Sequence, residues 1–590
     1  MENNLLKLRQ LMNEHRIDAY IVGTHDPHNT EYLSDYYKSR EWITGFTGSQ
    51  GIAIITQKDA FLWTDGRYFI QAEKQMRDRG FKLMKIGIPG YPDYKEWLVN
   101  NLDDYSVLGI WGAVFPYKEW IDIKNSLIDK NIIIKDDKDL IGILWDERPL
   151  LPQGKVFVLD VEYSGRSVED KLLDIRKSMV AKKAEFLLVT TLDDVAWLYN
   201  IRGTDLPQSL SIFSYALITD ESAYLYIDKS KIDDITISGL SKSGVEIRRY
   251  YSIFDDLIKI KNSSIWCDLN SLTLKMFNSI DDSNNYINEI LPTTMFKAIK
   301  NEVEIAQQKK AYYEDGLAIV RTHHWLKSEL VKGNTITEID VENKLEEYRN
   351  MNSCYLGKSF DTISAYGPNA AMMHYRALED DHSVIERKGF HLMDCGAQFP
   401  FGTTDTTRAI VVGDLTQEQK VAYTLALKGN INLSRAKFLK GTTGHSLDIL
   451  ARYYLWQNGI DYKSGTGHGI GFAMNVHEGP HRISPIPNSI SMVPGMIVSN
   501  EPGVYITGDF GIRLENILVV EDFVSNEHGT FYKFDTLSYL PFEPEAILPE
   551  LLSSDEIKWL NDYNAKVYDL YEKALSDEEK DWLAKATETI

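Results

Sequence analysis

The chain has 590 residues, of which 43% are hydrophobic and 25% are charged, and it carries a net charge of −22 at neutral pH. A chain of this length exceeds what one hydrophobic core supports, so we expect about three or four domains. The acidic balance and the lack of any Lys- or Arg-rich cluster exclude nucleic acid as a partner, because phosphate-backbone binding needs a basic face.

Cysteine content and apolar patterning indicate the compartment. Cys267, Cys354 and Cys395 are too few and too scattered for a disulfide framework or a zinc ribbon. The N-terminus has neither the uninterrupted apolar region nor the cleavage site of a secretory signal. No apolar run approaches the roughly 18 residues that a membrane span requires. We therefore expect a cytoplasmic protein with no membrane partner.

The first 152 residues have the pattern of an α/β domain. Leu5, Leu8 and Met12 recur at helical spacing, which predicts an amphipathic helix over residues 4–15. Short β-branched or apolar runs then predict three strands, and a further helix follows them; these elements cover 19–22, 51–56, 60–64 and 69–76. Strands that alternate with helices are typical of an α/β fold.

A proline-rich passage, Arg148–Pro152, breaks the regular pattern and predicts a linker. The same order of elements then begins again, with strands predicted at 156–161 and 184–190 and helices at 167–179 and 193–199. We therefore expect two related α/β domains, residues 1–152 and 153–297. The repeat is visible in the order of elements and not in residue identity.

A third domain is predicted over residues 298–540. It begins with a long helix over 300–332 and a second over 338–351, and strands follow at 390–394 and 407–412. Thr416, with Gln419 three residues later, predicts a helix that begins with a capping box. Residues 541–590 form a C-terminal extension whose charged, tryptophan-bearing part from Ser554 onward is predicted to be helical.

Five polar residues of the third domain stand at the ends of apolar runs or in glycine-rich turns: Asp394, Asp405, His468, Glu501 and Glu515. Each alone is explained more simply by a structural role, because buried polar groups usually just find hydrogen-bond partners. Together they supply four carboxylates and one imidazole, which suits two divalent cations in charge and in ligand type. The oxygen-rich set without cysteine favours Mn²⁺ or Co²⁺ over structural zinc.

The sequence motifs around these five residues resemble those of a known protein family. The segments that surround the five residues resemble the proline peptidases of the pita-bread metallopeptidase family; they are Met393–Ala397, Thr404–Arg408, Gly465–Gly471, Asn475–Pro480, Asn500–Gly503 and Gly511–Asn516. Segments upstream resemble the three-domain Xaa-Pro aminopeptidases, the aminopeptidase P type; they are Trp63–Phe69, Ala196–Gly203 and Gly367–Ala370, which leads to His374. The resemblance covers essentially the whole chain.

The resemblance implies a fold and an activity. The expected fold is two related N-terminal α/β domains followed by a pita-bread α+β catalytic domain. The expected activity is hydrolysis of the bond between an N-terminal residue and a following proline. Two divalent metals, with Mn²⁺ expected and Co²⁺ or Zn²⁺ as alternatives, would hold the hydroxide that attacks the peptide carbonyl. The family also implies a homodimer.

The resemblance further implies a role for each site residue. Asp394 would chelate one metal, Asp405 and Glu515 would bridge both, and His468 and Glu501 would complete the other. Glu501 is the candidate general base. Two more histidines correspond to the family's non-ligand active-site histidines, with His477 assigned to the proline-side pocket and His374 to the carbonyl or developing oxyanion. Tyr505 and Arg513 would orient ligands and provide a proton path.

Three alternatives share the fold. A prolidase would cut only dipeptides, but that subgroup generally lacks the second α/β domain. A creatinase-like amidinohydrolase needs none of the five ligands, and a peptide- or histone-binding module would have lost them. The presence of all five ligand positions therefore favours a metal-dependent peptidase.

Overall fold

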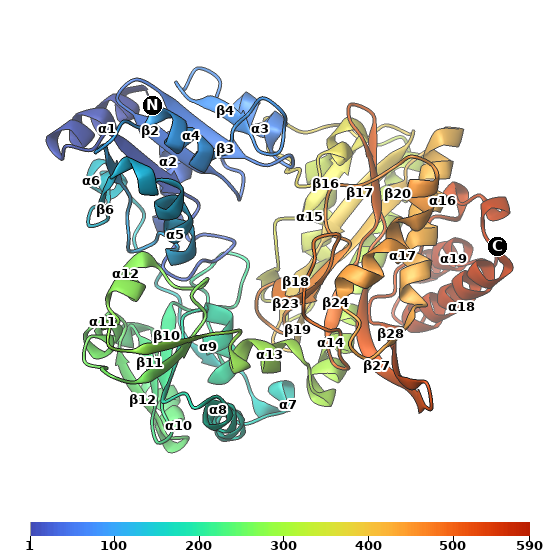
Figure 1. Ribbon diagram of the computed structural model, residues 1–590. Helices are drawn as coiled ribbons and strands as arrows, with labels where there is room; N and C mark the ends of the chain where they lie inside the picture. Colours follow the sequence, from blue (N-terminus) through green and yellow to red (C-terminus); the bar gives the residue numbers. More distant parts are fainter. Residues whose placement is uncertain (1) are drawn as a thin grey trace. The chain divides into compact units, whose positions relative to one another are not determined.

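The computed structural model describes residues 2–590, and they divide into two compact units (Figure 1). The first unit contains the residues up to Val158, together with Arg166–Pro207 and Ser211–Thr293. The second contains Leu159–Gly165, Gln208–Leu210 and Thr294–Ile590. No helix among the described residues has both the length and the apolar content to cross a bilayer.

The first unit begins with a six-stranded mixed sheet in the order β4-β3-β2-β1-β5-β6. Its strands are β1 (Ala19–Gly23), β2 (Ile52–Thr56), β3 (Ala60–Thr64), β4 (Lys82–Lys85), β5 (Val107–Gly109) and β6 (Ile133–Lys135). Helices accompany the strands: α1 (Glu2–Glu14), α2 (Ser39–Thr44), α3 (Phe69–Gln75), α4 (Tyr94–Asn101), α5 (Tyr117–Ser126) and α6 (Leu140–Leu144). Leu5, Leu8 and Met12 are buried, so the predicted apolar stripe is the core face of α1.

A second six-stranded sheet in the same unit has the order β12-β11-β10-β8-β13-β14. Its strands are β8 (Phe186–Val189), β10 (Ser214–Ile218), β11 (Ala223–Ile227), β12 (Val245–Arg249), β13 (Ser264–Cys267) and β14 (Asn285–Asn288). The main helices are α8 (Val168–Lys182), α9 (Leu192–Leu198), α10 (Asp234–Lys242), α11 (Ser252–Leu257) and α12 (Leu274–Asn278). The next helix, α13 (Pro292–Ala298), contains Thr293, the residue at which the first unit ends.

The two sheets have the same topology. In chain order, the first three strands of each sheet (β1-β2-β3 and β8-β10-β11) pair antiparallel, and the fourth strand (β4 or β12) pairs parallel with the third. The fifth and sixth strands (β5-β6 and β13-β14) are parallel and extend the sheet from the other side of the first strand. The expectation of two related α/β folds is therefore confirmed at the level of strand order. Residue identity carries little of this likeness because a buried strand needs only apolar, β-branched side chains, which many sequences provide.

One predicted strand was wrong in most of its length. Residues 156–161 were expected to be extended, but only β7 (Phe157–Val158) is, and it pairs with β9 (Ile201–Arg202). The short helix α7 (Val161–Ser164) follows at once, because the carboxylate of Asp160 accepts a hydrogen bond from the backbone N–H of Glu162 and caps it.

The second unit contains four main helices, which pack against one another in pairs and against its strands: α14 (Glu302–Val331), α15 (Glu338–Arg349), α16 (Gln417–Ser434) and α17 (Gly444–Gln457). The capping box expected at Thr416 and Gln419 is present at the start of α16. Two further helices, α18 (Ser554–Tyr571) and α19 (Asp577–Ala586), make up the C-terminal extension. They pack against α16 and α14 respectively, so the extension belongs to the core of this unit (Figure 1).

Two antiparallel sheets of the second unit carry the predicted ligand residues or lie next to them. The smaller one has the order β16 (Ile363–Tyr366), β17 (Phe390–Cys395), β20 (Thr406–Val411). The larger one has the order β21 (Lys437–Leu439), β28 (Gly529–Thr536), β27 (Asn516–Asn526), β24 (Ile497–Asn500), β22 (Gly467–Ile470), β23 (His477–Ile483). Short hairpin strands complete the unit: β18 (Ala397–Phe399) with β19 (Gly402–Thr403), and β25 (Gly503–Ile506) with β26 (Phe510–Arg513).

Candidate metal centre

Two of the carboxylates are brought together by the pairing of β17 with β20. Asp394 lies opposite Thr407 in this antiparallel ladder, and Asp405 precedes β20 by one residue. The chain between them forms the extra hairpin β18–β19, so the connection is longer than a simple turn but still returns to the same sheet end. The expected juxtaposition is found, because carboxylate oxygens of Asp394, Asp405 and Glu515 lie within 4.8 Å of one another.

Three more ligand candidates come from the larger sheet. His468 lies in β22, and Glu501 follows the last residue of β24, as its Pro502–Gly503 neighbours predicted. Glu515 lies in the two-residue break between β26 and β27, directly before the first residue of β27. Its backbone N–H donates to the carbonyl of Thr407 at 3.1 Å, which holds the break against β20.

Glycines around His468 allow the neighbouring strands to approach. A Cβ atom added at Gly467 would lie 1.9 Å from the carbonyl oxygen of Ser499, and one at Gly469 would lie 2.3 Å from that of Glu478. Both distances are shorter than any side chain permits, so these positions require glycine. The glycine-rich stretch thus serves close backbone packing around the imidazole, although it forms strand β22 and not the turn that was expected.

The ligand atoms form three overlapping groups. Besides the group of Asp394, Asp405 and Glu515, one consists of His468, Glu501 and Glu515, and another of Asp405, His468 and His477; within each, the atoms lie within 4.8 Å of one another. Glu515 belongs to the first two groups and Asp405 to the first and third. His468 also belongs to two groups. Of these three shared residues, Asp405 and Glu515 are carboxylates, whose two oxygens can each bind a different metal, and they are the two that the resemblance assigns as bridging.

Burial makes this cluster costly without cations. Asp394 Oδ1 and Glu515 Oε1 are buried and have no hydrogen-bond partner. Burial raises the pKa of Asp394 and Glu501 above their usual range and that of Glu515 well above it, because neighbouring carboxylates add to the desolvation. Unpaired buried carboxylate oxygens that converge on one point are the donor set that hard or borderline divalent cations need. The residues therefore fit a metal pair.

Arg513 is the main cation already in the centre. Its Nη2 pairs closely with Asp394 Oδ2, its Nη1 donates to the hydroxyl of Tyr505 at 2.9 Å, and its Nε donates to Thr407 Oγ1 at 3.0 Å. Neighbouring acidic groups outweigh burial and keep the pKa of Arg513 well above its usual value, so it remains charged. The fork of the guanidinium orients three partners at once, which a lysine could not do.

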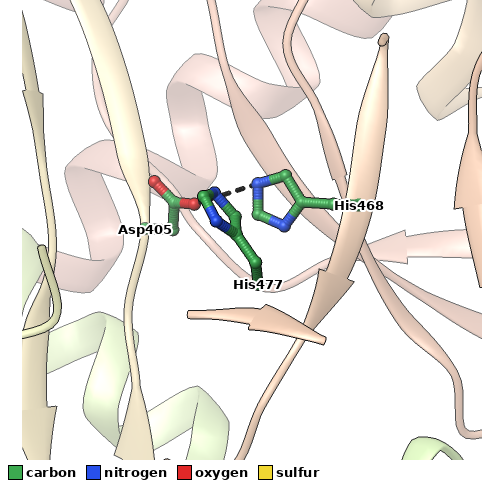
Figure 2. A group of neighbouring side chains, drawn as sticks. All are labelled: Asp405, His468 and His477. Atoms are coloured by element: carbon green, nitrogen blue, oxygen red, sulfur yellow. Dashed lines mark ion pairs between the residues drawn. The ribbon is translucent and has the colours of Figure 1, made fainter. Parts of the chain in front are cut away.

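The two predicted non-ligand histidines lie in different segments of the second unit. His477 begins β23, and its ring stands edge-on to that of His468, with centroids 4.3 Å apart (Figure 2). The same view shows the Asp405 carboxylate beside both rings, with Asp405 Oδ2 3.3 Å from His468 Nε2. Geometry alone would therefore allow His477 as a ligand. His374 is partly buried in the segment that follows β16.

Sequence reasoning missed two hydroxyl residues of the centre. Thr407 Oγ1 donates to Glu515 Oε2 at 2.8 Å, and Ser499 Oγ donates to Glu501 Oε1 at 3.1 Å. Ser499 also accepts the backbone N–H of His468 at 3.0 Å. Strand alternation could have predicted Thr407, because it lies two residues after Asp405 and its side chain therefore points to the same side of the strand. Ser499 has no comparable signal.

Arg408 links the centre to the C-terminal extension. This fully buried guanidinium donates to the carbonyl oxygens of Thr407 and Glu515. It also donates at 3.0 Å to the carbonyl of Leu540 and to the hydroxyl of Tyr563 in α18. The backbone that carries Glu515 is thereby fixed to a helix that lies far away in the sequence.

Family models match successive parts of the chain. The Creatinase/Prolidase N-terminal domain matches twice, at residues 5–137 and 147–304. Metallopeptidase family M24 matches residues 307–522, and the C-terminal region of peptidase_M24 matches residues 530–590. The centre described above lies entirely within the M24 match.

Relatives that match the chain over its whole length point to the same family. The chain is 39% identical to a probable Xaa-Pro aminopeptidase P of Tuber melanosporum, with 100% of this chain and 99% of that protein covered. It is 36% identical to aminopeptidase P1 of Lotus japonicus over 100% of both chains. The crystal structure of X-prolyl aminopeptidase from Caenorhabditis elegans, described as a cytosolic enzyme with a di-nuclear active site, superposes with a TM-score of 0.94 at 32% identity over 100% of this chain and 99% of that one. The chain belongs to metallopeptidase family M24 and, within it, to the Xaa-Pro aminopeptidases of the aminopeptidase P type.

Proposed function

We propose that this Xaa-Pro aminopeptidase holds two divalent metals through Asp394, Asp405, His468, Glu501 and Glu515, with Asp405 and Glu515 shared between them. The observation that carries the proposal is that Asp405 and Glu515 are the carboxylates that each belong to two ligand groups, together with the unpartnered oxygens of Asp394 and Glu515. Two divalent ions balance the four carboxylates in charge. When bound, they would supply a water acidic enough to act as hydroxide near neutral pH.

Glu501 is the proposed general base, which takes the proton of the attacking water and passes it to the proline nitrogen that leaves. Burial raises its pKa, and a base is most effective when its pKa lies near the working pH. The hydroxyl of Ser499 fixes one carboxylate oxygen, Oε1, which also lies 3.5 Å from His468 Nε2. The other oxygen, Oε2, lies 4.0 Å from Arg513 Nε. A positioned carboxylate between two cationic or hydrogen-bonding groups can hold a proton during the reaction.

Tyr505 and Arg513 are proposed to orient the ligands and to conduct protons. The chain Tyr505–Arg513–Asp394 is continuous, since the guanidinium contacts both the phenol and the carboxylate. Burial raises the pKa of Tyr505, so its hydroxyl stays neutral and can donate to substrate while it accepts from Arg513.

Substrate contacts are proposed for two histidines. His477, whose ring stands beside that of His468, would line the pocket for the proline ring, and His374 would donate to the peptide carbonyl as negative charge develops on its oxygen. Proline in the substrate lacks an N–H, so a dedicated pocket must replace the hydrogen bond that a general aminopeptidase makes.

The proposed metal is Mn²⁺, with Co²⁺ or Zn²⁺ as alternatives, because oxygen ligands predominate. A cytoplasmic location is proposed from the three free cysteines and from the description of the C. elegans enzyme as cytosolic. A homodimer is proposed from family resemblance alone.

The test is an assay of metal-stripped and Mn²⁺-restored protein on a tripeptide X-Pro-Y, a dipeptide X-Pro, a tripeptide X-Ala-Y and creatine. We expect metal-dependent release of the first residue from X-Pro-Y, and its loss in Asp405→Ala and Glu515→Ala. Glu521→Ala is the matched control, since this carboxylate of β27 is only half-buried, belongs to none of the three ligand groups and pairs with Lys533 at 3.2 Å. Metal-independent turnover, or equal cleavage of X-Ala-Y, refutes the proposal.

A further inference from the structure

Glu338, the first residue of α15, has a role that the mechanism above does not use. Its side chain is fully buried. Four neutral groups donate to its carboxylate: the backbone N–H groups of Tyr366 at 2.6 Å and Ser383 at 2.7 Å, the hydroxyl of Tyr375 at 2.8 Å, and the amide of Asn369 at 3.0 Å. A carboxylate surrounded in this way stays satisfied in the interior because ionised acceptors make the stronger hydrogen bonds.

All four donors lie in one segment, residues 366–383. Tyr366 ends β16 and Ser383 lies at the other end of the segment, so a single carboxylate ties its two ends together. The backbone adds to this, since the N–H of Glu338 donates to the carbonyl of Ser383 at 3.1 Å. Asn369 and Tyr375 attach the interior of the segment to the same point. The segment is thus a closed loop whose buried polar anchor is Glu338, and the half-exposed ion pair of Arg376 with Asp361 at 3.0 Å adds a second contact nearer the surface.

His374 is part of this loop and precedes Tyr375 directly. The phenol of Tyr375 is held neutral, because burial and the charge of Glu338 raise its pKa, and so it remains a donor to the carboxylate. The position of the His374 backbone therefore depends on the bond between Tyr375 and Glu338.

The other side of the loop is packed against the metal centre. A Cβ atom added at Gly511 in β26 would lie 1.8 Å from the carbonyl oxygen of Ala370, so the loop backbone touches this strand directly. Arg513, the partner of Asp394, lies two residues further along the same strand. The loop is therefore held between Glu338 and β26, and a shift of its anchor changes where His374 stands relative to the ligands.

We propose that Glu338 is a positioning residue for His374: it fixes the loop 366–383 so that the imidazole stands at the substrate carbonyl. This inference rests on the proposed role of His374. It predicts that loss of the anchor slows the chemical step and leaves the metal ligands in place, because none of the five ligands lies in the loop.

The first test measures the loop itself. In Glu338→Gln an NH₂ group replaces one carboxylate oxygen and can no longer accept hydrogen bonds. Each oxygen of Glu338 accepts two of the four bonds, so two of them are lost as they stand. Amide hydrogen exchange in residues 366–383 is expected to be about tenfold faster or more, whereas the rest of α15 is unchanged. Glu347→Gln is the matched control on the same helix, since Glu347 pairs with Lys344 at 2.6 Å near the surface. Unchanged exchange in the loop overturns the anchor.

The second test is a double-mutant cycle with His374→Ala on an X-Pro-Y peptide at saturating Mn²⁺. Glu338→Gln is expected to lower kcat by about 10- to 100-fold with KM and Mn²⁺ affinity nearly unchanged, because a displaced catalytic group costs this much. In the His374→Ala background the same substitution is expected to cost little, since its effect passes through the imidazole. Equal losses in both backgrounds overturn the inference.

A third variant tests the same inference if Glu338→Gln does not fold. Tyr375→Phe removes only the hydroxyl next to His374 and is expected to lower kcat by about 3- to 10-fold, again only when His374 is present. Wild-type exchange and kcat in Tyr375→Phe overturn the inference. A His374→Ala variant with full activity refutes the proposed role of His374 instead, whereas the exchange experiment still reports on the anchor.

Discussion

Thr407→Val tests whether a hydroxyl behind the ligands sets metal affinity. Thr407 is fully buried, and its Oγ1 donates to Glu515 Oε2 at 2.8 Å and accepts from Arg513 Nε at 3.0 Å. Valine has nearly the same shape, so packing is kept and only these two bonds are lost. Each involves a charged partner and contributes about 1.5–3 kcal/mol, which bounds the total cost at about 3–6 kcal/mol.

Part of this cost falls on the metal. Without the threonine hydroxyl, Glu515 loses its fixed rotamer, and loss of such a partner typically weakens metal binding by about 10- to 100-fold, or about 1.4–2.8 kcal/mol. The remainder lowers the stability of the apo protein. The assay is calorimetric titration of metal-stripped protein with Mn²⁺, with a thermal unfolding curve of the same sample.

Thr322→Val is the matched control. Thr322 is equally buried, but its hydroxyl donates only to the carbonyl of Ala318 within α14, at 2.8 Å. We expect it to lower Tm and leave Mn²⁺ affinity unchanged. If Thr407→Val binds Mn²⁺ as tightly as the wild type, the hydroxyl does not orient Glu515 and the reasoning is refuted.

Three further results are expected. Burial lowers the pKa of His28 to about 4 and of His391 to about 3. Below about pH 6.5 the unfolded chain takes up protons that the folded one does not, so stability is full above that pH and falls by about 2 kcal/mol per histidine by pH 5. Unfolding curves across this range should show the fall, and His391→Gln should flatten it; an equal slope in that variant contradicts the assignment. Tyr563→Phe removes the hydroxyl that accepts from Arg408 and from the backbone N–H of Leu540, and should lower the free energy of unfolding by about 1–3 kcal/mol in a denaturant titration; an unchanged midpoint would show that this hydroxyl contributes little to stability. Tyr505→Phe should lower kcat for X-Pro-Y by about 10-fold or more if the phenol conducts protons, and should leave Mn²⁺ affinity near the wild-type value; a wild-type kcat rules out that role.

Much of the fold was predictable because it depends on local pattern. The apolar stripe of α1 and the capping box at Thr416 are each set by residues a few positions apart, and both were found where expected. The wrong strand at 156–161 shows the limit of this reasoning. A single side chain, Asp160, caps a helical turn there, and a local cap overrides the extended preference of the residues before it.

The sequence by itself determined the chemical type of the centre. Five residues with metal-ligating side chains stand near the ends of apolar runs or among glycines, and four carboxylates with one imidazole predict a site for two divalent cations. Their family motifs then specify a proline-specific peptidase. This information is local, because each ligand is marked by its own residue type and its immediate neighbours.

Only the tertiary structure decided which candidate ligands lie together and which neighbouring side chains hold them in place. Glu515 contacts Thr407 across more than a hundred residues, and Glu338 anchors a loop whose far end is Ser383. Threonine, serine and glutamate are common in every protein, so nothing in their local pattern marks these particular ones. Their roles arise from burial, which makes each hydrogen bond costly to lose, and from the pairing of strands that lie far apart in the chain.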